Sequence, residues 1–354
     1  MQRGSCFTRY FRFLLAACTF PALVSAQNAA NEKGAVTIEY IAHACFRLTS
    51  PSGKQVLIDP YASRVWLGYD FPADLRADAV LISHPHYDHD GGEAMHHKVP
   101  WPSNTLVLRT PGTNQIGDVT VAGFAGKHAD PWGKEFGQSN TIWLVEIAGL
   151  RMVHLGDNGP LAETKIRQLG RVDVLMMPID SQFHILKADE IAAIRKKLSP
   201  AVVIPMHYRH DDLEMDSDKP EKLGGIDGWA KTEANVRYLS TNKLELSAAT
   251  LPTKPEVLIL KHSPLVQRPT PSEATSVPAI GAMSLVGPAI SFRTIHHRWP
   301  KDYDELLPML KPAGDKREKL VKFAELPDGS LEISSVDQGQ TNRLTLPVQD
   351  PTRR

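Results

Sequence analysis

The sequence predicts an α+β fold in which two β-sheets form the core and helices pack outside them. Three observations support this prediction. Short β-like runs dominate the first two thirds of the 354-residue chain, helical patterns are fewer, and a proline-rich segment precedes a small tail. With 42% hydrophobic and 23% charged residues, the composition is globular, which excludes a disordered or collagen-like protein.

Eight runs of β-branched or apolar residues, each bounded by Gly, Pro or Asp, predict the strands. They are residues 36–42, 55–60, 79–83, 104–109, 141–147, 151–155, 173–178 and 201–205. Helical patterns lie at 161–169 and 187–198, and in the second one Ile191, Ile194 and Leu198 share one face. Strands followed by helix–strand units predict two sheets with helices packed on the outside.

The first 26 residues have the pattern of an export signal. Three arginines precede an apolar stretch at 13–24, and small residues at 24–26 suit a signal peptidase. A lipoprotein signal processed at Cys18 is an alternative, whereas the apolar stretch is too short for a membrane span. We therefore expect an exported protein, periplasmic or secreted, with no transmembrane span once the signal is removed.

Charge and cysteine content exclude two further classes of protein. Since 40 Lys and Arg balance 40 Asp and Glu without a long basic run, we expect no nucleic-acid partner. Removal of the signal takes away three Arg and no acidic residue, which leaves 37 against 40 and a formal charge of −3. It also removes Cys6 and Cys18, so Cys45 has no intramolecular disulfide partner and is expected to be a small buried hydrophobe.

A domain boundary is predicted after residue 262. Residues 263–282 form a Pro-rich linker, and residues 283–350 form a small C-terminal α+β module of unknown function. Within the module, the patterns predict helices at 282–297 and 302–310 and paired strands at 330–335 and 343–348. The main domain is expected to span residues 36–262.

The motif HPHYDHDGG, at 84–92, directly follows a predicted buried strand. In an extended segment His84 and His86 point the same way and can hold one ion, while Asp88 and His89 follow toward a second position. Four residues of ligand type within six positions indicate a metal site at this strand end.

Three later residues extend the set. His128, Asp157 and His207 each stand just after a strand or in a short loop. A lone histidine is more often structural than a ligand. Their order and their placement at strand ends nevertheless favour a single site shared with the motif at 84–92.

The pattern H-x-H-x-D-H, followed by His, Gly-Asp and His, resembles the metallo-β-lactamase superfamily over about residues 36–262. The resemblance implies an αββα sandwich with its site at one edge between the two sheets. It also implies two sets of ligands with Asp157 bridging them, namely His84, His86 and His128 for a first metal and Asp88, His89 and His207 for a second.

Ligand chemistry favours Zn²⁺, with Mn²⁺ as the alternative, because imidazole and carboxylate groups are present without thiolate. Two ions about 3.5–4 Å apart can hold a hydroxide and polarise the bond under attack, so no Ser or Cys nucleophile is needed. The sequence therefore predicts a metal-dependent hydrolase in which a (di)zinc-bound hydroxide cleaves an ester, lactone or phosphodiester. Asp88 and Asp157 are the candidate catalytic residues.

Departures from sister families narrow the branch. His86 stands where di-iron relatives usually carry Glu, and Asp157 stands where true β-lactamases tend to carry Cys or Ser. Only 50 positions separate Asp157 from His207, which leaves no room for the domain that nucleic-acid-processing relatives insert. The remaining resemblance is to the lactonase-like and phospholipase D-like branch.

This branch implies further site residues. YIAHACF supplies His43 and IPMHY supplies Tyr208, and both are expected to contact the substrate, as is His184 in PIDSQFHI. Ala42 departs from the glycine usual before this histidine, and a hydrogen bond from His43 to a strand end is an equal alternative. Asp59 resembles an aspartate that supports the metal loop by fixing imidazole tautomers.

Two other functions are consistent with the sequence. One is a phosphodiesterase that acts on lipid-like substrates. The other is a non-catalytic metal-binding envelope protein that acts through its C-terminal module. The expected partner is accordingly a small-molecule or lipid-like substrate.

Overall fold

We used a computed structural model of the whole chain. The structure describes residues 34–61, 67, 69–72, 74–86, 88–91, 104–130, 132–135, 137–179, 185–213, 223–267, 285, 289, 292–293, 296, 298–301, 305–306, 321–337 and 340–346. The predicted export signal and His184 lie outside these residues. No helix within the described ranges is long and apolar enough to cross a bilayer.

The smaller of two large sheets has the strand order β13-β1-β2-β3-β4-β5. Its strands are β1 (Val36–Ala42), β2 (Cys45–Thr49), β3 (Gln55–Ile58), β4 (Ala79–Leu81), β5 (Leu106–Leu108) and β13 (Lys243–Leu246). β2 runs antiparallel to both β1 and β3, and β4 and β5 continue parallel to β3. The carboxyl ends of β1, β3 and β4 therefore meet at one edge.

The larger sheet has the order β12-β14-β11-β10-β9-β8-β7-β6. Its strands are β6 (Gly112–Ile116), β7 (Val119–Lys127), β8 (Ser139–Ile147), β9 (Leu150–His154), β10 (Val174–Pro178), β11 (Val202–Met206), β12 (Val236–Tyr238) and β14 (Glu256–Ile259). β9, β10 and β11 are parallel, and β8 is antiparallel to β7 and β9. The carboxyl ends of β7, β9 and β11 thus share an edge as well.

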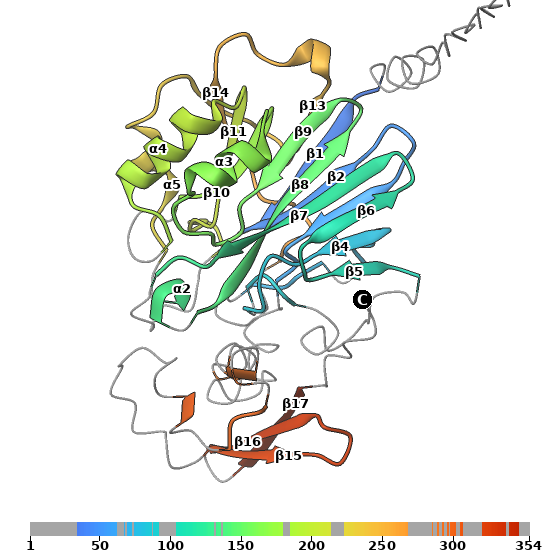
Figure 1. Cartoon of the computed structure of the whole chain (residues 1–354), viewed down its shortest axis with the longest axis vertical. Coiled ribbons are helices and arrows are strands. Elements are labelled where there is room, and N and C mark those ends of the chain that lie inside the picture. Colours follow the sequence, from blue (N-terminus) through green and yellow to red (C-terminus); the bar gives the residue numbers. More distant parts are fainter. Residues whose placement is uncertain are drawn as a thin grey trace, which may run out of the picture.

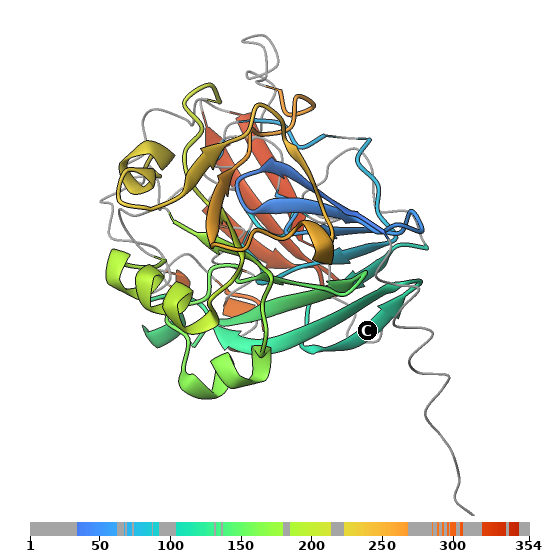
Figure 2. The same cartoon turned by 90° about the horizontal axis from the view of Figure 1, so that it is seen from above.

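Helices connect the parallel strands of the larger sheet and cover its outer face (Figures 1 and 2). They include α3 (Glu163–Leu169), between β9 and β10, and α4 (Ala188–Leu198), between β10 and β11. The shorter elements are α2 (Trp132–Glu135), α5 (Ile226–Ala230) and the 3₁₀ helix η1 (Ala248–Thr250). In α4 the predicted face is confirmed, because Ile191, Ile194 and Leu198 are buried.

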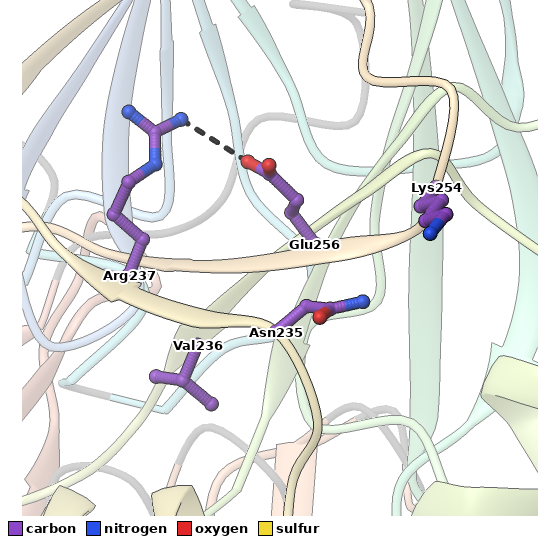
Figure 3. A pocket seen from close by; sticks show the side chains of 5 residues that line it. All are labelled: Asn235, Val236, Arg237, Lys254 and Glu256. Carbon is purple, nitrogen blue, oxygen red and sulfur yellow. Dashed lines mark hydrogen bonds and ion pairs between the residues drawn. The ribbon is translucent and has the colours of Figure 1, made fainter.

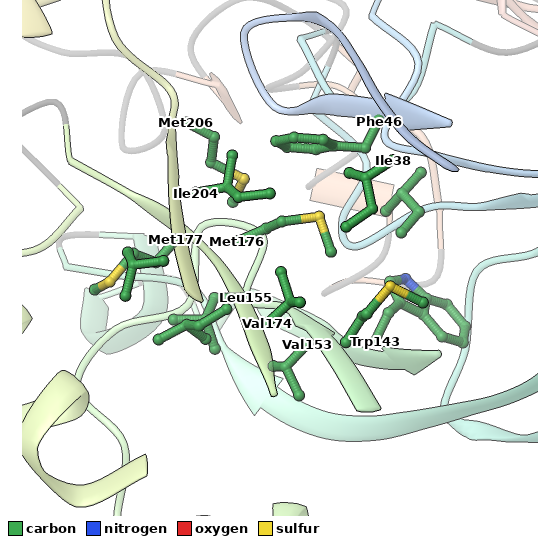
Figure 4. Close-up of a cluster of buried hydrophobic side chains, with 14 of the residues drawn as sticks. Ile38, Phe46, Trp143, Val153, Leu155, Val174, Met176, Met177, Ile204 and Met206 are labelled. Atoms are coloured by element: carbon green, nitrogen blue, oxygen red, sulfur yellow. The ribbon is translucent and has the colours of Figure 1, made fainter. Parts of the chain in front are cut away.

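The main hydrophobic core lies between the two sheets (Figure 4). Ile38 and Phe46 from the smaller sheet face Met176 and Ile204 from the larger one, and Trp143 fills the same layer. Because strand side chains alternate, the intervening residues point to the outer faces. Burial of each large apolar side chain contributes about 1.5–3 kcal/mol.

A second cluster covers the outer face of the smaller sheet. Cys45 and Leu57 point outward from β2 and β3 and pack against Tyr61, Tyr69 and Phe71 of the loop after β3. Cys45 is a free, buried thiol, as predicted. The burial raises the pKa of this thiol well above its ordinary value, so Cys45 has the character of a hydrophobe rather than of a nucleophile.

The described part of the C-terminal tail is an antiparallel three-stranded sheet, β15-β16-β17. Its strands are β15 (Val321–Glu325), β16 (Leu331–Asp337) and β17 (Gln340–Leu346). The predicted pairing of 330–335 with 343–348 is confirmed, whereas β15 was not predicted. The indole of Trp299 donates to the carbonyl of Gly329 at 2.8 Å and ties the preceding segment to this sheet.

Several predicted elements need correction. The strands expected at 55–60, 79–83 and 104–109 are shorter, with β3 ending before Asp59 because that residue turns into a left-handed conformation with φ +48°. The helices predicted at 282–297 and 302–310 lie largely outside the described residues, so they stay predictions. Strands β2, β6, β7, β12, β13 and β14 were missed, because their Gly, Thr and charged residues obscure the apolar alternation.

Candidate metal centre

The predicted ligands all follow strands that end at the shared edge. His84, His86, Asp88 and His89 lie in the loop after β4, His128 follows β7, Asp157 follows β9, and His207 follows β11. His43 lies in the turn between β1 and β2. Strand direction alone therefore brings residues from both sheets to one place.

His84, His86, His128 and Asp157 form the first of two groups with converging donor atoms. His84 Nε2 lies 3.0 Å from His86 Nδ1 and 3.7 Å from Asp157 Oδ2. His128 Nε2 lies 3.5 Å from the same carboxylate oxygen. The structure thus brings together the three histidines predicted for a first ion, with Asp157 beside them.

The second group is His43, Asp88, His89 and His207. Asp88 Oδ2 lies 3.5 Å from Nε2 of both His89 and His207. Asp157 contacts this group too, since its Oδ1 lies 3.2 Å from His89 Nε2 and its Oδ2 lies 3.4 Å from His207 Nε2. Asp157 therefore stands between the two groups, in the place predicted for a bridging ligand.

Four of the histidines are held through the ring nitrogen that points away from the centre. His84 Nδ1 lies 2.9 Å from Ser83 Oγ, and His89 Nδ1 lies 2.8 Å from Asp59 Oδ2. His86 Nε2 lies 3.1 Å from Gln138 Oε1, and His128 Nδ1 lies 2.9 Å from the Ala129 carbonyl. When each outer N–H donates in this way, the inner nitrogen presents a lone pair to the centre.

The inner atoms fit a pair of cations. Among the described residues, the buried atoms without a hydrogen-bond partner include His89 Nε2, His128 Nε2 and Asp157 Oδ1. Buried polar atoms are normally hydrogen-bonded, so converging orphans of this kind indicate a missing ligand. The donors are imidazoles and carboxylates, which suit Zn²⁺ or Mn²⁺.

Electrostatics point the same way. Burial alone would raise the pKa of Asp157, but attraction to His207 and His89 holds it well below its ordinary value. Burial lowers the pKa of His86 to about 3, with repulsion from His128 adding to the effect. An ionised Asp157 carboxylate beside the uncharged His86 ring gives this part of the site negative charge, which attracts a cation.

His89 differs from the other ring ligands. Burial lowers its pKa, yet attraction to Asp157, Asp88 and Asp59 outweighs burial and raises the pKa well above its ordinary value. A cation that takes the Nε2 lone pair would replace the proton that these carboxylates otherwise stabilise.

Strained backbone marks the same edge. His43, Asp59 and His207 have φ values of +56°, +48° and +60°. Residues other than glycine rarely adopt this left-handed backbone conformation, and where they do the surrounding structure must hold them there. Here the N–H of His207 donates to the carbonyl of His43 at 2.9 Å, which joins two of the strained residues.

Asp157 is placed by a turn that requires glycine. Gly156 has φ +56°, and a Cβ at this position would lie 2.5 Å from Ser83 Cβ. The Asp157 N–H donates to Asn140 Oδ1 at 3.2 Å, and the Asp157 carbonyl accepts from Ala129 N at 2.8 Å. The turn is therefore packed against the metal loop and joined to the residue that follows His128.

Asp59 contacts the loop that it was predicted to support. Its two oxygens accept from Ser83 N at 2.7 Å and from Ser83 Oγ at 2.6 Å, in addition to His89 Nδ1. Asp90 plays a comparable part at the other end of the loop, where Arg109 of the segment after β5 donates to both of its oxygens at 2.9 and 3.1 Å.

The predicted substrate contacts have different outcomes. Tyr208 is buried, its hydroxyl donates to the Leu260 carbonyl at 3.4 Å, and its ring stacks on Tyr40. His43 is fully buried beside Asp88. The roles of these two residues in substrate contact stay predictions, and His184 lies outside the described residues.

Two further contributors were not predicted from the sequence. Gln138 holds His86, and the fully buried His154 donates through Nε2 to the Ala44 carbonyl at 2.8 Å while its Nδ1 accepts from Gly156 N at 3.1 Å. No sequence motif marks a glutamine that holds a histidine ring or a buried histidine within a strand. The only available signal was that His154 directly precedes the Leu-Gly-Asp turn.

A family model described as a β-lactamase superfamily domain matches residues 37–207. This range contains all seven predicted ligands. The domain belongs to the metallo-β-lactamase superfamily. The observed sandwich, with its metal centre at one edge between two sheets, is the fold that the resemblance implied.

The matches to relatives of this metallo-β-lactamase domain cover most of each relative's length. A protein of Rubrobacter xylanophilus named UPF0173 metal-dependent hydrolase is 27% identical over 203 residues, which are 49% of this chain and 82% of the relative. A protein of the same name from Polaromonas is 27% identical over 242 residues, 56% of this chain and 87% of the relative.

Similar solved structures also match over most of their own length. A metallo-β-lactamase superfamily protein of Thermotoga maritima is 26% identical and has a TM-score of 0.49, with 64% of this chain and 100% of that chain covered. The metallo-β-lactamase fold protein YhfI of Bacillus subtilis is 16% identical, with a TM-score of 0.42 and coverage of 65% and 98%.

A surface pocket of about 240 Å³ lies apart from the predicted ligands, at the strand pair β12–β14 (Figure 3). It is lined by Asn235, Val236, Arg237, Lys254 and Glu256. Arg237 and Glu256 form an ion pair at 3.1 Å across it. None of these residues belongs to the metal centre.

Proposed function

We propose that this metal-dependent hydrolase is exported and uses two zinc ions to cleave an ester, lactone or phosphodiester bond. One observation carries the proposal. Seven predicted ligands from four separate chain segments converge at one edge of the sandwich, and Asp157 contacts both groups of donors. Convergence of this kind has no structural purpose unless cations occupy it, because it leaves buried polar atoms unpaired.

The residues of the chain have distinct tasks in this proposal. The carboxylate of Asp157 lies within 3.7 Å of four ring nitrogens and would hold two cations at a fixed spacing. Ser83, Gln138, Asp59 and the Ala129 carbonyl fix the rings, so little reorganisation is needed when the site reacts. The bound ions would supply Lewis-acid polarisation of the substrate and activation of the attacking water.

Zinc is proposed because the donors of the site are nitrogen and oxygen. Cys45 would be the one cysteine left after removal of residues 1–26. It packs in the cluster on the outer face of the smaller sheet and does not join the metal centre. Mn²⁺ is the alternative that the same donors support. The proposed substrate is a small molecule or a lipid-like molecule, met outside the cytoplasm after removal of residues 1–26.

Hydrolysis and metal content test the proposal together. The purified full chain, loaded with Zn²⁺, is assayed on aryl esters, lactones, phosphodiesters, thioesters and β-lactams while bound metal is counted by mass spectrometry. We expect two ions per chain and turnover of at least one ester, lactone or phosphodiester, with both lost after EDTA and restored by Zn²⁺.

The exposed acidic residue Asp189, in the first turn of α4, provides a matched control. Asp189→Asn should leave metal content and turnover unchanged. A wild-type protein that binds no transition metal, or whose turnover survives complete removal of metal, would contradict the proposed chemistry. Export is tested separately, since the mature amino terminus in a secreting host should begin after Ala26.

A further inference from the structure

We infer that His43 is a ligand of the second ion, through Nε2, so that this position has four protein donors besides the bridging Asp157. The inference rests on the proposed function, because it assigns a residue to a cation that the function requires. The branch resemblance implied only a substrate contact for this histidine.

The position of the His43 side chain supports ligation. Its Nε2 lies 3.0 Å from Asp88 Oδ2, the same oxygen that Nε2 of His89 and of His207 approach at 3.5 Å. The four donor atoms all lie within 4.8 Å of one another. Three imidazole nitrogens therefore converge on one carboxylate oxygen, which places a common cation among them.

A role in orienting Asp88 is the competing explanation, and the rest of the site argues against it. Residues that orient ligands here contact the outer atom, as Ser83 does at His84 Nδ1 and Gln138 does at His86 Nε2. His43 instead meets the inner oxygen of Asp88, the one that faces the other donors. Its place is that of a ligand and not of an outer partner.

The backbone around His43 is built to hold it in this place. The residue has φ +56°, and its carbonyl accepts both His207 N at 2.9 Å and the Tyr40 hydroxyl at 3.0 Å. The next carbonyl, of Ala44, accepts from His154 Nε2. Strain at a non-glycine residue whose carbonyl accepts two hydrogen bonds, with a third at the next carbonyl, is typical of functional positions.

Ligation by His43 makes the two positions unequal. The first ion would have three histidines and Asp157, whereas the second would have three histidines, Asp88 and Asp157. Protein donors thus fill more of the second position, and the first ion keeps more room for substrate and water. We expect the second position to bind its ion more tightly.

Cobalt substitution tests this directly on the full-length wild-type protein. In the two-cobalt form, each ligating imidazole gives a paramagnetically shifted ring N–H resonance. Six ligating histidines are expected with His43, and five without it. Six shifted resonances, one of them assigned to His43 by its loss in a variant, support the inference, while five overturn it.

His43→Gln separates ligation from orientation. Glutamine keeps an N–H donor for Asp88 but is a poor metal ligand, so ligation predicts a loss of about 100-fold or more in affinity for the second ion, more than an outer partner would contribute. The cobalt absorption spectrum should change with it. His262→Gln, which alters a histidine paired with Asp212 outside the centre, is the matched control.

The outcomes are distinguishable. If His43→Gln binds two cobalt ions with wild-type affinity and spectrum, His43 is not a ligand and the inference fails while the proposed function stands. If the wild-type protein binds no cobalt, the proposed function itself fails. Thermal unfolding in EDTA checks the fold, and the wild-type resonance count decides the matter should the variant not fold.

Discussion

The two groups of metal ligands are supported by different chemistry. Around the first group, the outer ring nitrogens meet neutral partners, namely the Ser83 hydroxyl, the Gln138 amide and the Ala129 carbonyl. In the second group, His89 donates to the carboxylate of Asp59. A carboxylate partner makes the imidazole a stronger donor than a neutral partner does, so equal numbers of histidines need not give equal affinities.

This difference suggests a division of labour within one site. The second position lies deeper, since His43 and His89 are fully buried, whereas His86 of the first group is partly exposed. Asp88 and Asp157 would hold an ion at the second position firmly, and the more exposed first group would leave its ion open to substrate. Catalytic metal sites keep such an open position, and structural sites do not.

Asp157→Asn is expected to have the largest effect, because this carboxylate contacts both groups. Loss of its charge removes the bridge, and turnover should fall roughly 10³-fold or more, equivalent to several kcal/mol of transition-state stabilisation. Metal counting should show fewer than two ions per chain. Asp189→Asn is the control, and a fully active Asp157→Asn protein with two bound ions would show that Asp157 does not bridge.

Asp59→Asn tests the charged support of the second group. The substitution keeps the size of the side chain but removes the charge that His89 Nδ1 and Ser83 meet. Affinity for the second ion should fall about 10- to 100-fold, with a smaller change at the first. A two-step cobalt titration measures both, and preferential loss of the first ion would reverse the comparison.

The sequence predicted which residues converge at the site better than it predicted the residues that hold them. The convergence of the seven predicted ligands was predictable because His and Asp recur at strand ends in a characteristic order, and parallel strands bring such ends together. Gln138 was not, since its role depends on how β8 lies beside the loop after β4. Prediction of the left-handed turn at His43 also required tertiary information. The same holds for strand β7, whose two glycines obscure its strand pattern.

Gln138 allows the neutral support to be weakened or converted. Gln138→Leu removes the partner of His86 Nε2, and we expect a loss of about 10-fold in affinity for the first ion alone. Gln138→Glu places a carboxylate there, as Asp59 does for His89, and should raise that affinity instead. Opposite shifts in a cobalt titration would support the comparison, and identical losses in both variants would mean that packing matters more than charge.

Ser83→Ala should have the smallest effect and should spread it over both positions. Its hydroxyl donates to Asp59 Oδ2 at 2.6 Å and lies 2.9 Å from His84 Nδ1, so one side chain serves a ligand of each group. Asp59 keeps the Ser83 N–H and His89 as donors in the variant, which limits the loss. We expect each affinity to fall by less than about 10-fold and by similar factors, because Asp59 still holds the His89 ring and the His84 ring loses only a neutral partner. An effect confined to one ion would show that the serine supports that position only, and that the two groups are less coupled than their shared hydroxyl implies.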